Sequence, residues 1–309
     1  STRHPLQSVI EVGRRSRRSI TLHRIRRGMH RELVCLSGTP VCFHGNPGNA
    51  GDALIQAGTL AAFDRAALTW EPVQPGDDVS GRTVLVGGGG NLTPMYDHIA
   101  SALRAFLVCD PARVVILPHG LRGQDDVLGL LRPSDTVFCR DATAYQHASL
   151  ATQAMVRLEH DMAFHVDPVR LLSEGDRDQA ARAFLDQRLA EHQWSLDEIH
   201  RKDTMRYMRV DAERRPDADD GDLDISLHLI HGSVHSVSPI AAWALLRCIA
   251  SSRSIVTDRL HVAIGAALVG VPTELQPNSY DKNKSVFLTS LERFRNIRYV
   301  ERASETQRP

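Results

Sequence analysis

Short apolar runs recur along the first half of the chain, and each is followed by glycine or polar residues. The runs at 41–43, 83–86, 114–117 and 136–139 are rich in Val, Leu, Ile and Phe, a pattern typical of buried strands. The stretch at 53–63 carries apolar residues at helical spacing soon after the first run. Strand, loop and helix in this order predict a doubly wound α/β fold, in which ligands bind at the carboxyl ends of the strands.

A second set of elements begins after about residue 200. Charged residues at helical spacing over 170–203 predict helices that join two halves, and alternation over 205–213 predicts the first strand of the second half. A further strand begins at Ile255 and leads into small and apolar residues that predict a helix. The predicted segments are 1–40, 41–203 and 204–309.

The composition is that of an ordinary globular protein. Of the 309 residues, 42% are hydrophobic and 24% are charged, and the chain is long enough for two hydrophobic cores. The 37 basic and 37 acidic side chains balance, so the chain as a whole is not built to bind nucleic acid. Five cysteines without a CxxC pair favour a reduced, cytoplasmic protein with no zinc or redox site. No apolar run approaches the ~18 residues that span a bilayer.

The first forty residues are strongly basic. Eight arginines lie between positions 14 and 31, with Ile20, Leu22, Ile25 and Met29 among them. Such a segment could contact an anionic membrane, which would place the protein peripherally on the inner face of the plasma membrane. A solvated helix face beside the core also explains the pattern, and both interpretations stay open.

Two glycine-rich loops follow the first two strands. The loop at 44–52 contains Asn49, Gly51 and Asp52 and leads into a helix, where Asp52 is either an ordinary helix cap or a catalytic carboxylate. Its spacing matches neither common nucleotide-binding glycine motif. Four consecutive glycines at 87–90 cost backbone entropy and contribute no packing. They predict that a ligand or another loop approaches the backbone closely.

Chargeable residues stand at the ends of the later strands. His119 follows the third run, Arg140 and Asp141 follow the fourth, and Asp161 ends the next segment. One such residue is usually a cap or a salt-bridge partner, whereas several strand ends at one sheet edge predict a shared cleft.

The stretch after Ile255 carries the clearest chemistry. Arg259 and His261 lie where a helix begins, and the unpaired N–H groups of a helix N-terminus already favour an anion. Lys282 and Lys284 follow one loop later. The pattern predicts an anion-binding active site at the carboxyl end of a parallel strand.

Taken in chain order, these motifs resemble the polysaccharide pyruvyltransferase family. They are NAGD at 49–52, the glycines after the second strand, Arg140 with Asp141, Asp161, RLH at 259–261, and NSY at 278–280 with the two lysines behind it. The resemblance covers nearly the whole chain after about residue 40. One departure is His119, where many members carry glutamine.

The resemblance implies two Rossmann-like halves facing a central cleft, similar to the GT-B glycosyltransferases. It also implies transfer of the enolpyruvyl group of phosphoenolpyruvate onto two hydroxyls of a sugar, in an exopolysaccharide or a lipid-linked oligosaccharide. The products would be a pyruvate ketal and free phosphate. This scheme requires no cofactor and no metal.

Phosphoenolpyruvate carries a carboxylate and a phosphate, so we expect two cationic anchors, and Arg140 and Arg259 offer planar forks for them. His261 is the leading acid or base, because imidazoles titrate near neutrality. Asp52 and Asp141 are candidate carboxylate partners. The other candidate substrate contacts are Asn49, Gly51, Gly88, Gly89, Asn91, His119, Leu260, Asn278, Tyr280, Lys282 and Lys284.

Two other functions stay open. A glycosyltransferase that uses a nucleotide sugar shares the fold and the cationic pocket, and Glu274 would then bind the ribose hydroxyls. A carbohydrate-binding scaffold is the third interpretation. It is less favoured, because sugar-binding surfaces usually stack rings on aromatic side chains and only 5% of the residues are aromatic.

Overall fold

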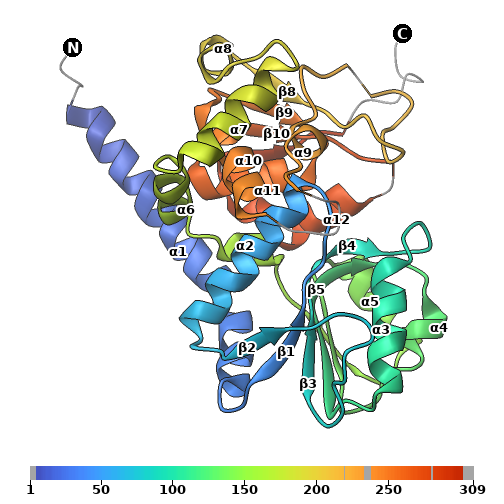
Figure 1. Ribbon diagram of the computed structural model, residues 1–309. Helices are drawn as coiled ribbons and strands as arrows, with labels where there is room; N and C mark the ends of the chain where they lie inside the picture. The colour runs from blue at the N-terminus through green and yellow to red at the C-terminus, as the bar shows by residue number, and fades with distance from the viewer. Residues whose placement is uncertain (1–4, 219, 233–237, 280, 302–309) are drawn as a thin grey trace.

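Two parallel sheets with helices packed around them form the molecule (Figure 1). The computed structural model describes residues 5–218, 220–232, 238–279 and 281–301, with side chains from residue 17 onward. The first sheet has seven strands and the second has four, and all of their pairings are parallel. The predicted α/β class is therefore confirmed, and the two sheets are consistent with two Rossmann-like halves.

The first sheet reverses its strand order between β1 and β3. Its strands lie in the order β2, β1, β3, β5, β6, β7, and β4 pairs with β5. The carboxyl ends of β1 and β3 therefore form a topological switch point, the place where ligands bind in doubly wound folds. The elements are β1 (Val41–His44), α2 (Ala50–Arg65), β2 (Trp70–Pro72), β3 (Thr83–Val86), β4 (Gly89–Leu92), α3 (His98–Val108), β5 (Arg113–Leu121), α4 (Asp125–Leu128), β6 (Thr136–Cys139), α5 (Ala142–Ala151) and β7 (Met155–Leu158).

The third predicted strand, at 114–117, is longer in the structure. β5 continues through His119 to Leu121, because neighbouring strands pair with this extension: Gly89 of β4 and Cys139 of β6 are both in register with His119. His119 is therefore part of a strand and not of the loop after it.

Alternate residues of the first sheet face two different cores. Val84 and Val86 lie in a core with α3 and α5, whereas Leu85 between them lies in a core that contains residues of both halves. This shared core includes α2, which packs against α10 (Pro239–Ser251) and α11 (Leu260–Val269). Although α2 belongs to the first half in sequence, it ties the two halves together (Figure 1).

The second half is built on strands in the order β11, β10, β9, β8. The strand predicted over 205–213 is wrong beyond Tyr207, where β8 ends. The N–H of Arg209 donates to Asp258 Oδ1 (2.8 Å) and not to a neighbouring strand, so the chain turns away from the sheet. The remaining elements are η1 (Met162–His165), α6 (Pro168–Gly175), α7 (Gln179–Ala190), α8 (Leu196–Arg201), β8 (Met205–Tyr207), α9 (Ile225–His228), β9 (Ile255–Thr257), β10 (Thr273–Leu275), α12 (Lys282–Thr289), η2 (Leu291–Arg293) and β11 (Ile297–Tyr299).

The helices predicted over 170–203 are present as α6, α7 and α8. The predicted boundary after residue 203 falls between α8 and β8, yet all three helices pack against α10 of the second half. In spatial terms they cover the second sheet more than the first.

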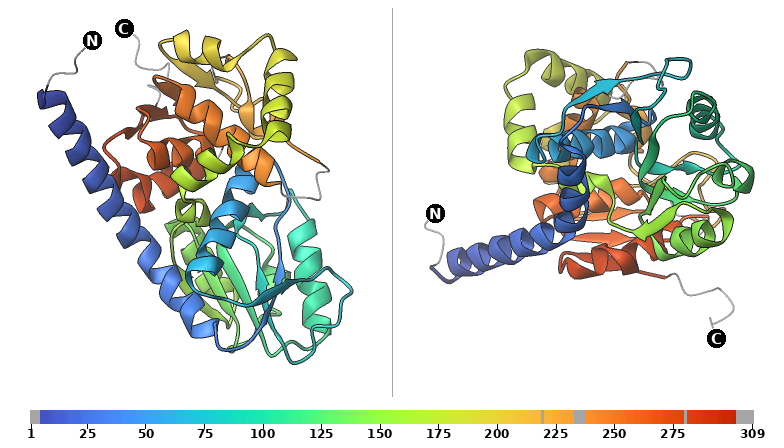
Figure 2. Two further views of the ribbon diagram at one scale, coloured as in Figure 1. Left: turned by 60° about the vertical axis from the view of Figure 1, so that its left-hand side comes forward. Right: turned by 90° about the horizontal axis from the view of Figure 1, so that it is seen from below.

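Helix α1 (Pro5–Leu36) runs along the outside of the molecule, and its N-terminal end extends away from the body (Figures 1 and 2). One side of it is buried from Leu22 onward, because Leu22, Ile25, Met29 and Leu33 recur every three or four residues. This is the helix face beside the core that the sequence allowed. None of the helices in the described ranges is long and apolar enough to cross a membrane.

Gly58 is expected to tolerate no side chain. It lies within α2, where a Cβ would collide with the carbonyl oxygen of Met162. On helix propensity alone Gly58→Ala would gain up to ~1 kcal/mol, but such overpacking costs ~1–3 kcal/mol. We expect a lower midpoint of thermal unfolding. Gly38→Ala, where a Cβ meets no atom within 4 Å, is the control, and an unchanged Gly58→Ala midpoint would contradict the packing of α2 on η1.

Candidate active site

The loops at the switch point pack tightly on one another. Asn46, in the loop after β1, donates from Nδ2 to the carbonyl of Gly88 (2.9 Å) and to Asn91 Oδ1 (2.8 Å). A Cβ at Gly88 would lie 2.6 Å from the carbonyl oxygen of Pro118, and one at Gly89 would collide with Asn46 Nδ2. Close approach of other chain segments, one of the two explanations that the sequence allowed, therefore accounts for these glycines.

A capping box closes the N-terminus of α2. Asn49 Oδ1 accepts from the N–H of Gly51 (2.8 Å), and Asp52 Oδ2 accepts from the N–H of Asn49 (2.9 Å). Asp52 thus has the capping role that the sequence allowed. Burial raises the pKa of Asp52, although the neighbouring His261 and two cations oppose the rise. A carboxyl group of raised pKa beside an imidazole can also exchange a proton, so the cap does not exclude a chemical role.

A buried trio of side chains joins the first half to the second. Arg140, directly after β6, donates from Nη1 to Asp161 Oδ2 (2.7 Å), and both side chains are fully buried. His261, in the first turn of α11, places Nε2 3.5 Å from Arg140 Nη1 and 3.5 Å from Asp161 Oδ2. On the other side of the ring, a Cβ at Gly51 would lie 2.6 Å from His261 Nδ1. The N-termini of α2 and α11 therefore meet at this trio.

The surrounding charges set two protonation states. Burial alone would raise the pKa of Asp161, but the hydrogen bond from His261 and the charge of Arg140 lower it well below its usual value, so Asp161 is a carboxylate. Burial, and then Arg140, lowers the pKa of His119 to about 3. His119 is therefore neutral at pH 7, and its Nε2 lies 3.0 Å from Asn91 Oδ1. It can orient Asn91 but cannot serve as a cationic anchor.

One edge of the Arg140 guanidinium is unused. Its Nε and Nη2 are buried and have no hydrogen-bond partner within the described part of the chain. Nε lies 3.1 Å from where a Cβ would stand at Gly120, and Nη2 would collide with a Cβ at Gly90. A small cavity opens between these glycines, and its lining residues are Gly90, Thr93, Gly120, Leu121, Arg122, Arg140, Asp141 and Lys282.

Lys282, the first residue of α12, is a second cation of this cavity. Its Nζ and Arg140 Nη2 both lie close to the position that a Cβ would take at Gly90. The Nζ is also 3.7 Å from Glu213 Oε2. Burial lowers the pKa of Lys282 to about 8, even though Glu213 acts in the opposite direction. With Arg122, three cations line this small cavity, and Arg140 brings two unpartnered N–H groups to it, so the cavity favours an anion.

Arg259 is held elsewhere and does not line this cavity. Its Nε donates to Asp224 Oδ1 (3.0 Å), its Nη2 bonds to Asp224 Oδ2, and its Nη1 pairs with Asp211 Oδ2 (2.9 Å). The whole fork is therefore taken up by carboxylates. A chain of alternating charges nevertheless connects it to the cavity, in the order Arg259, Asp211, Arg209, Glu213, Lys282.

The other predicted residues are spread more widely. Asp141 caps α5 and also lines the cavity. Asn278 is buried, and its side-chain oxygen accepts a hydrogen bond from the backbone N–H of Asn283 (3.2 Å). Leu260 is part of the shared core, and Lys284 is exposed and paired with an acidic side chain. Tyr280 lies outside the described residues.

Three acidic residues of this region carry no predicted role. The sequence marks Asp161 as a polar strand end and as one of the ordered motifs, without a role of its own, and Glu213 and Asp224 lie among many other acidic residues. A buried guanidinium requires a carboxylate close by. Arg140 and Arg259 therefore signal that partners exist, but local sequence does not say which carboxylates they are.

Among the described residues, no three His, Cys, Asp or Glu side chains converge as metal ligands.

Comparison with known proteins was made against families, curated proteins and solved structures. A family model described as polysaccharide pyruvyl transferase matches residues 49–273, a range that includes Arg140, Asp161 and His261. The crystal structure of a functionally uncharacterised protein from Klebsiella pneumoniae is similar to this chain, with a TM-score of 0.69 and 25% sequence identity. The match covers 89% of this chain and 98% of that chain. No curated protein matches. The family resemblance drawn from the motifs is thus confirmed.

Arg259→Ala is expected to destabilise the fold. It would leave Asp224, whose side chain is 0% exposed, as a buried carboxylate without its bidentate partner, and breaking such a pair costs ~3–5 kcal/mol. We expect a large fall in the urea midpoint. Arg259→Ala combined with Asp224→Ala should lose less than the sum of the two single variants, because no buried charge is then left alone. Strictly additive losses would show that the two side chains do not stabilise each other.

Proposed function

We infer that this chain, which belongs to the polysaccharide pyruvyl transferase family, transfers the enolpyruvyl group of phosphoenolpyruvate to a sugar of a cell-surface glycan. The product would be a cyclic pyruvate ketal on an exopolysaccharide or a lipid-linked oligosaccharide, with release of phosphate. The observation that carries this proposal is the unused edge of the buried Arg140, which faces a cavity shared with Lys282 at the carboxyl ends of β4, β5 and β6.

Arg140 and Lys282, two of the three cations that line the cavity, are assigned in this proposal to the two charged groups of the donor. Phosphoenolpyruvate carries a carboxylate and a phosphate on three carbons, so its anchors must lie close together but act from different directions. Arg140 offers two parallel N–H groups to one of these groups, and Lys282 offers a point charge to the other. In this proposal Arg259 is a positioning residue, because it acts on Lys282 through Asp211, Arg209 and Glu213.

In this proposal His261 moves the protons; it does not line the cavity itself, but its Nε2 lies 3.5 Å from Nη1 of Arg140 in the cavity wall. When the first sugar hydroxyl attacks the central carbon of the donor, that hydroxyl loses a proton and the methylene carbon gains one. Attack of the second hydroxyl displaces phosphate, which leaves with the second hydroxyl proton. His261 Nε2, 3.5 Å from the Asp161 carboxylate, can accept and return such a proton. Asp52, at the adjoining N-terminus of α2, is the candidate for the other transfer.

The glycosyltransferase alternative has less support. Glu274, its expected ribose ligand, is paired with Arg298 (2.9 Å) and does not line the cavity. The non-catalytic scaffold is not favoured either, because the matching family is one of transferases.

The decisive experiment compares donors first and then products. Calorimetric titration should detect binding of phosphoenolpyruvate and none of a panel of nucleotide sugars. With a pool of short bacterial glycans added, phosphate should be released and mass spectrometry should find a glycan that carries a pyruvate ketal. Binding of a nucleotide sugar without binding of phosphoenolpyruvate would overturn the proposal in favour of glycosyl transfer.

His261→Ala should lower turnover by ~10²–10⁴, the range typical of a lost general acid or base. Binding of phosphoenolpyruvate should stay near that of the parent, because Arg140 and Lys282 are retained. His23→Ala, at an exposed position on α1, is the matched control. If His261→Ala keeps parental turnover, His261 is not the proton carrier.

The pKa of Lys282 predicts how donor binding depends on pH. With a pKa of about 8 in the free protein, its ammonium is present below that pH and is lost above it, whereas the donor phosphate is already fully charged above its own pKa of ~6. The association constant should therefore fall as pH rises past 8. Lys282→Arg should flatten the curve, because a guanidinium stays charged. Titration calorimetry across this range tests the prediction, and an identical fall in Lys282→Arg would assign the titration to another group.

A further inference from the structure

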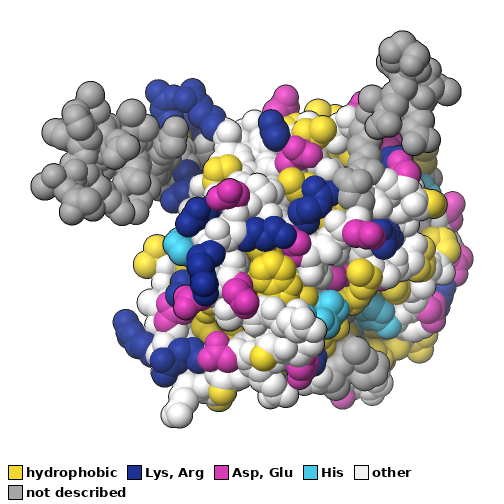
Figure 3. Space-filling model, turned by 90° about the horizontal axis from the view of Figure 1, so that it is seen from above, with side chains coloured by type: hydrophobic (Ala, Val, Ile, Leu, Met, Phe, Trp, Pro, Cys, Tyr) yellow, Lys and Arg dark blue, Asp and Glu magenta, His cyan; other side chains and the backbone are white. Residues whose placement is uncertain are grey.

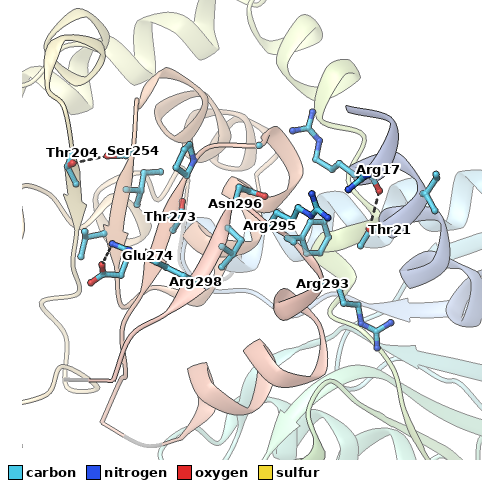
Figure 4. A pocket seen from close by; sticks show the side chains of 18 of the residues that line it. Arg17, Thr21, Thr204, Ser254, Thr273, Glu274, Arg293, Arg295, Asn296 and Arg298 are labelled. Atoms are coloured by element: carbon cyan, nitrogen blue, oxygen red, sulfur yellow. Dashed lines mark hydrogen bonds and ion pairs between the residues drawn. The ribbon is translucent and has the colours of Figure 1, made fainter. Parts of the chain in front are cut away.

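A groove lined by arginines lies at the amino ends of the strands of the second sheet (Figure 4). It has a volume of about 1070 Å³ and is formed by α1, by the amino ends of β9, β10 and β11, and by residues 293–296. Asp258, Arg259 and His261 follow the carboxyl end of β9, so the groove and these three residues lie at opposite ends of that strand. We call it the arginine groove; its arginines are Arg17, Arg18, Arg24, Arg293, Arg295 and Arg298.

The arginine groove concentrates positive charge in a chain whose charges balance overall. Its one acidic lining residue, Glu274, is already paired with Arg298 (2.9 Å). Within the described ranges, Arg17, Arg24, Arg293 and Arg295 take part in no ion pair. Like charges that line one hollow repel each other unless an anion joins them. The charge pattern therefore favours an anionic ligand.

The guanidinium groups come from two separate elements. Arg17, Thr21 and Arg24 lie on one face of α1 at spacings of four and seven residues. Arg293 and Arg295 approach from the segment before β11, and Figure 4 shows them near the end of the groove next to Arg17. Figure 3 shows Lys and Arg side chains where α1 leaves the body. A ligand in the groove would be gripped from both sides.

Packing holds both walls in place. Leu22 and Ile25, on α1 as well, are buried in the shared core. Asn296 donates from Nδ2 to the carbonyls of Ala266 (3.0 Å) and Val271 (2.8 Å), which secures the segment before β11. The groove is thus set by the fold and does not depend on the ligand to bring its walls together.

The lining combines arginine forks with apolar surface. A planar guanidinium fits two oxygens of a phosphate group, whereas the hydroxyls of Thr204 and Ser254, which also line the groove, bond to each other (2.7 Å). Ile20 of α1, which is 53% exposed, adds apolar surface beside the arginines. Nucleic acid or a free polyphosphate would make no use of this apolar surface. A phosphate ester with an attached hydrocarbon chain would use both.

We propose that the arginine groove binds the phosphate groups of an anionic amphiphile. Two sources share this chemistry: the headgroups of anionic phospholipids, and the diphosphate of an isoprenoid carrier. Either would hold the enzyme at a lipid surface, with Arg259 and His261 at the opposite end of β9. The proposal rests on the groove alone and does not require the proposed reaction.

The test is co-sedimentation of the full chain with vesicles at physiological salt. Three vesicle types are compared: phosphatidylcholine alone, phosphatidylcholine with phosphatidylglycerol, and phosphatidylcholine with a long-chain isoprenyl diphosphate. The groove variant is Arg293→Ala with Arg295→Ala, both at exposed positions outside the candidate active site. The matched control is Arg177→Ala with Arg182→Ala, which removes the same charge from exposed positions away from the groove.

We expect the parent to sediment with at least one of the charged vesicles and to remain in solution with phosphatidylcholine alone. Each basic residue near an anionic surface contributes about fivefold in affinity, so the groove variant should bind about 25-fold more weakly. The control should bind like the parent. Which charged vesicle binds identifies the source of the phosphate. No binding to either charged vesicle, or an equal loss in the control, would overturn the proposal.

Discussion

The candidate site depends on the buried ion pair between Arg140 and Asp161. A guanidinium cannot shed its charge in a protein interior, so it is stable there only with a carboxylate beside it. The pairing of β6 with β7, in which Cys139 is in register with Leu158, brings the two strand ends together and supplies that carboxylate. Because Asp161 contacts only Nη1, the fork keeps Nε and Nη2 for another partner. The contact with Asp161 therefore stabilises the buried charge of Arg140 and also fixes the orientation of its guanidinium.

The second half of the chain contributes to the candidate site mainly through a network of charged side chains and less through any single residue. Arg259 is fully engaged by Asp224 and Asp211, and its influence passes along alternating charges to Lys282. Such a network satisfies every buried charge it contains, which is the condition under which buried ionic groups are tolerated. Loss of one member leaves the next charge without its partner, so the network holds its parts in fixed positions.

Helix α2 determines how the two halves can act together. Leu54 lies in the same core as Leu246 of α10 and Leu268 of α11, so separating the halves would expose apolar surface at ~25 cal/mol per Å². The same helix presents Gly51 to the ring of His261. The contact between the N-termini of α2 and α11 is thus maintained by the hydrophobic packing behind it. Opening the site by parting the halves would be costly, which favours substrate entry without that motion.

The sequence by itself determined the strands at 41–43, 83–86 and 136–139, the polar residues at their ends, and the family, because periodicity, helix capping and motif order are local properties of the chain. It also identified Arg140, His261 and Lys282 as chemically suited side chains. Only the tertiary structure decided that Arg259 is occupied by Asp224, that Glu274 faces the arginine groove, and that β8 stops at Tyr207. Each of these depends on a partner from a distant segment; Arg140 and His261, for example, are 121 residues apart. Local patterns show which side chains need a partner, but the packing of α2 between the sheets decides which partners come within reach.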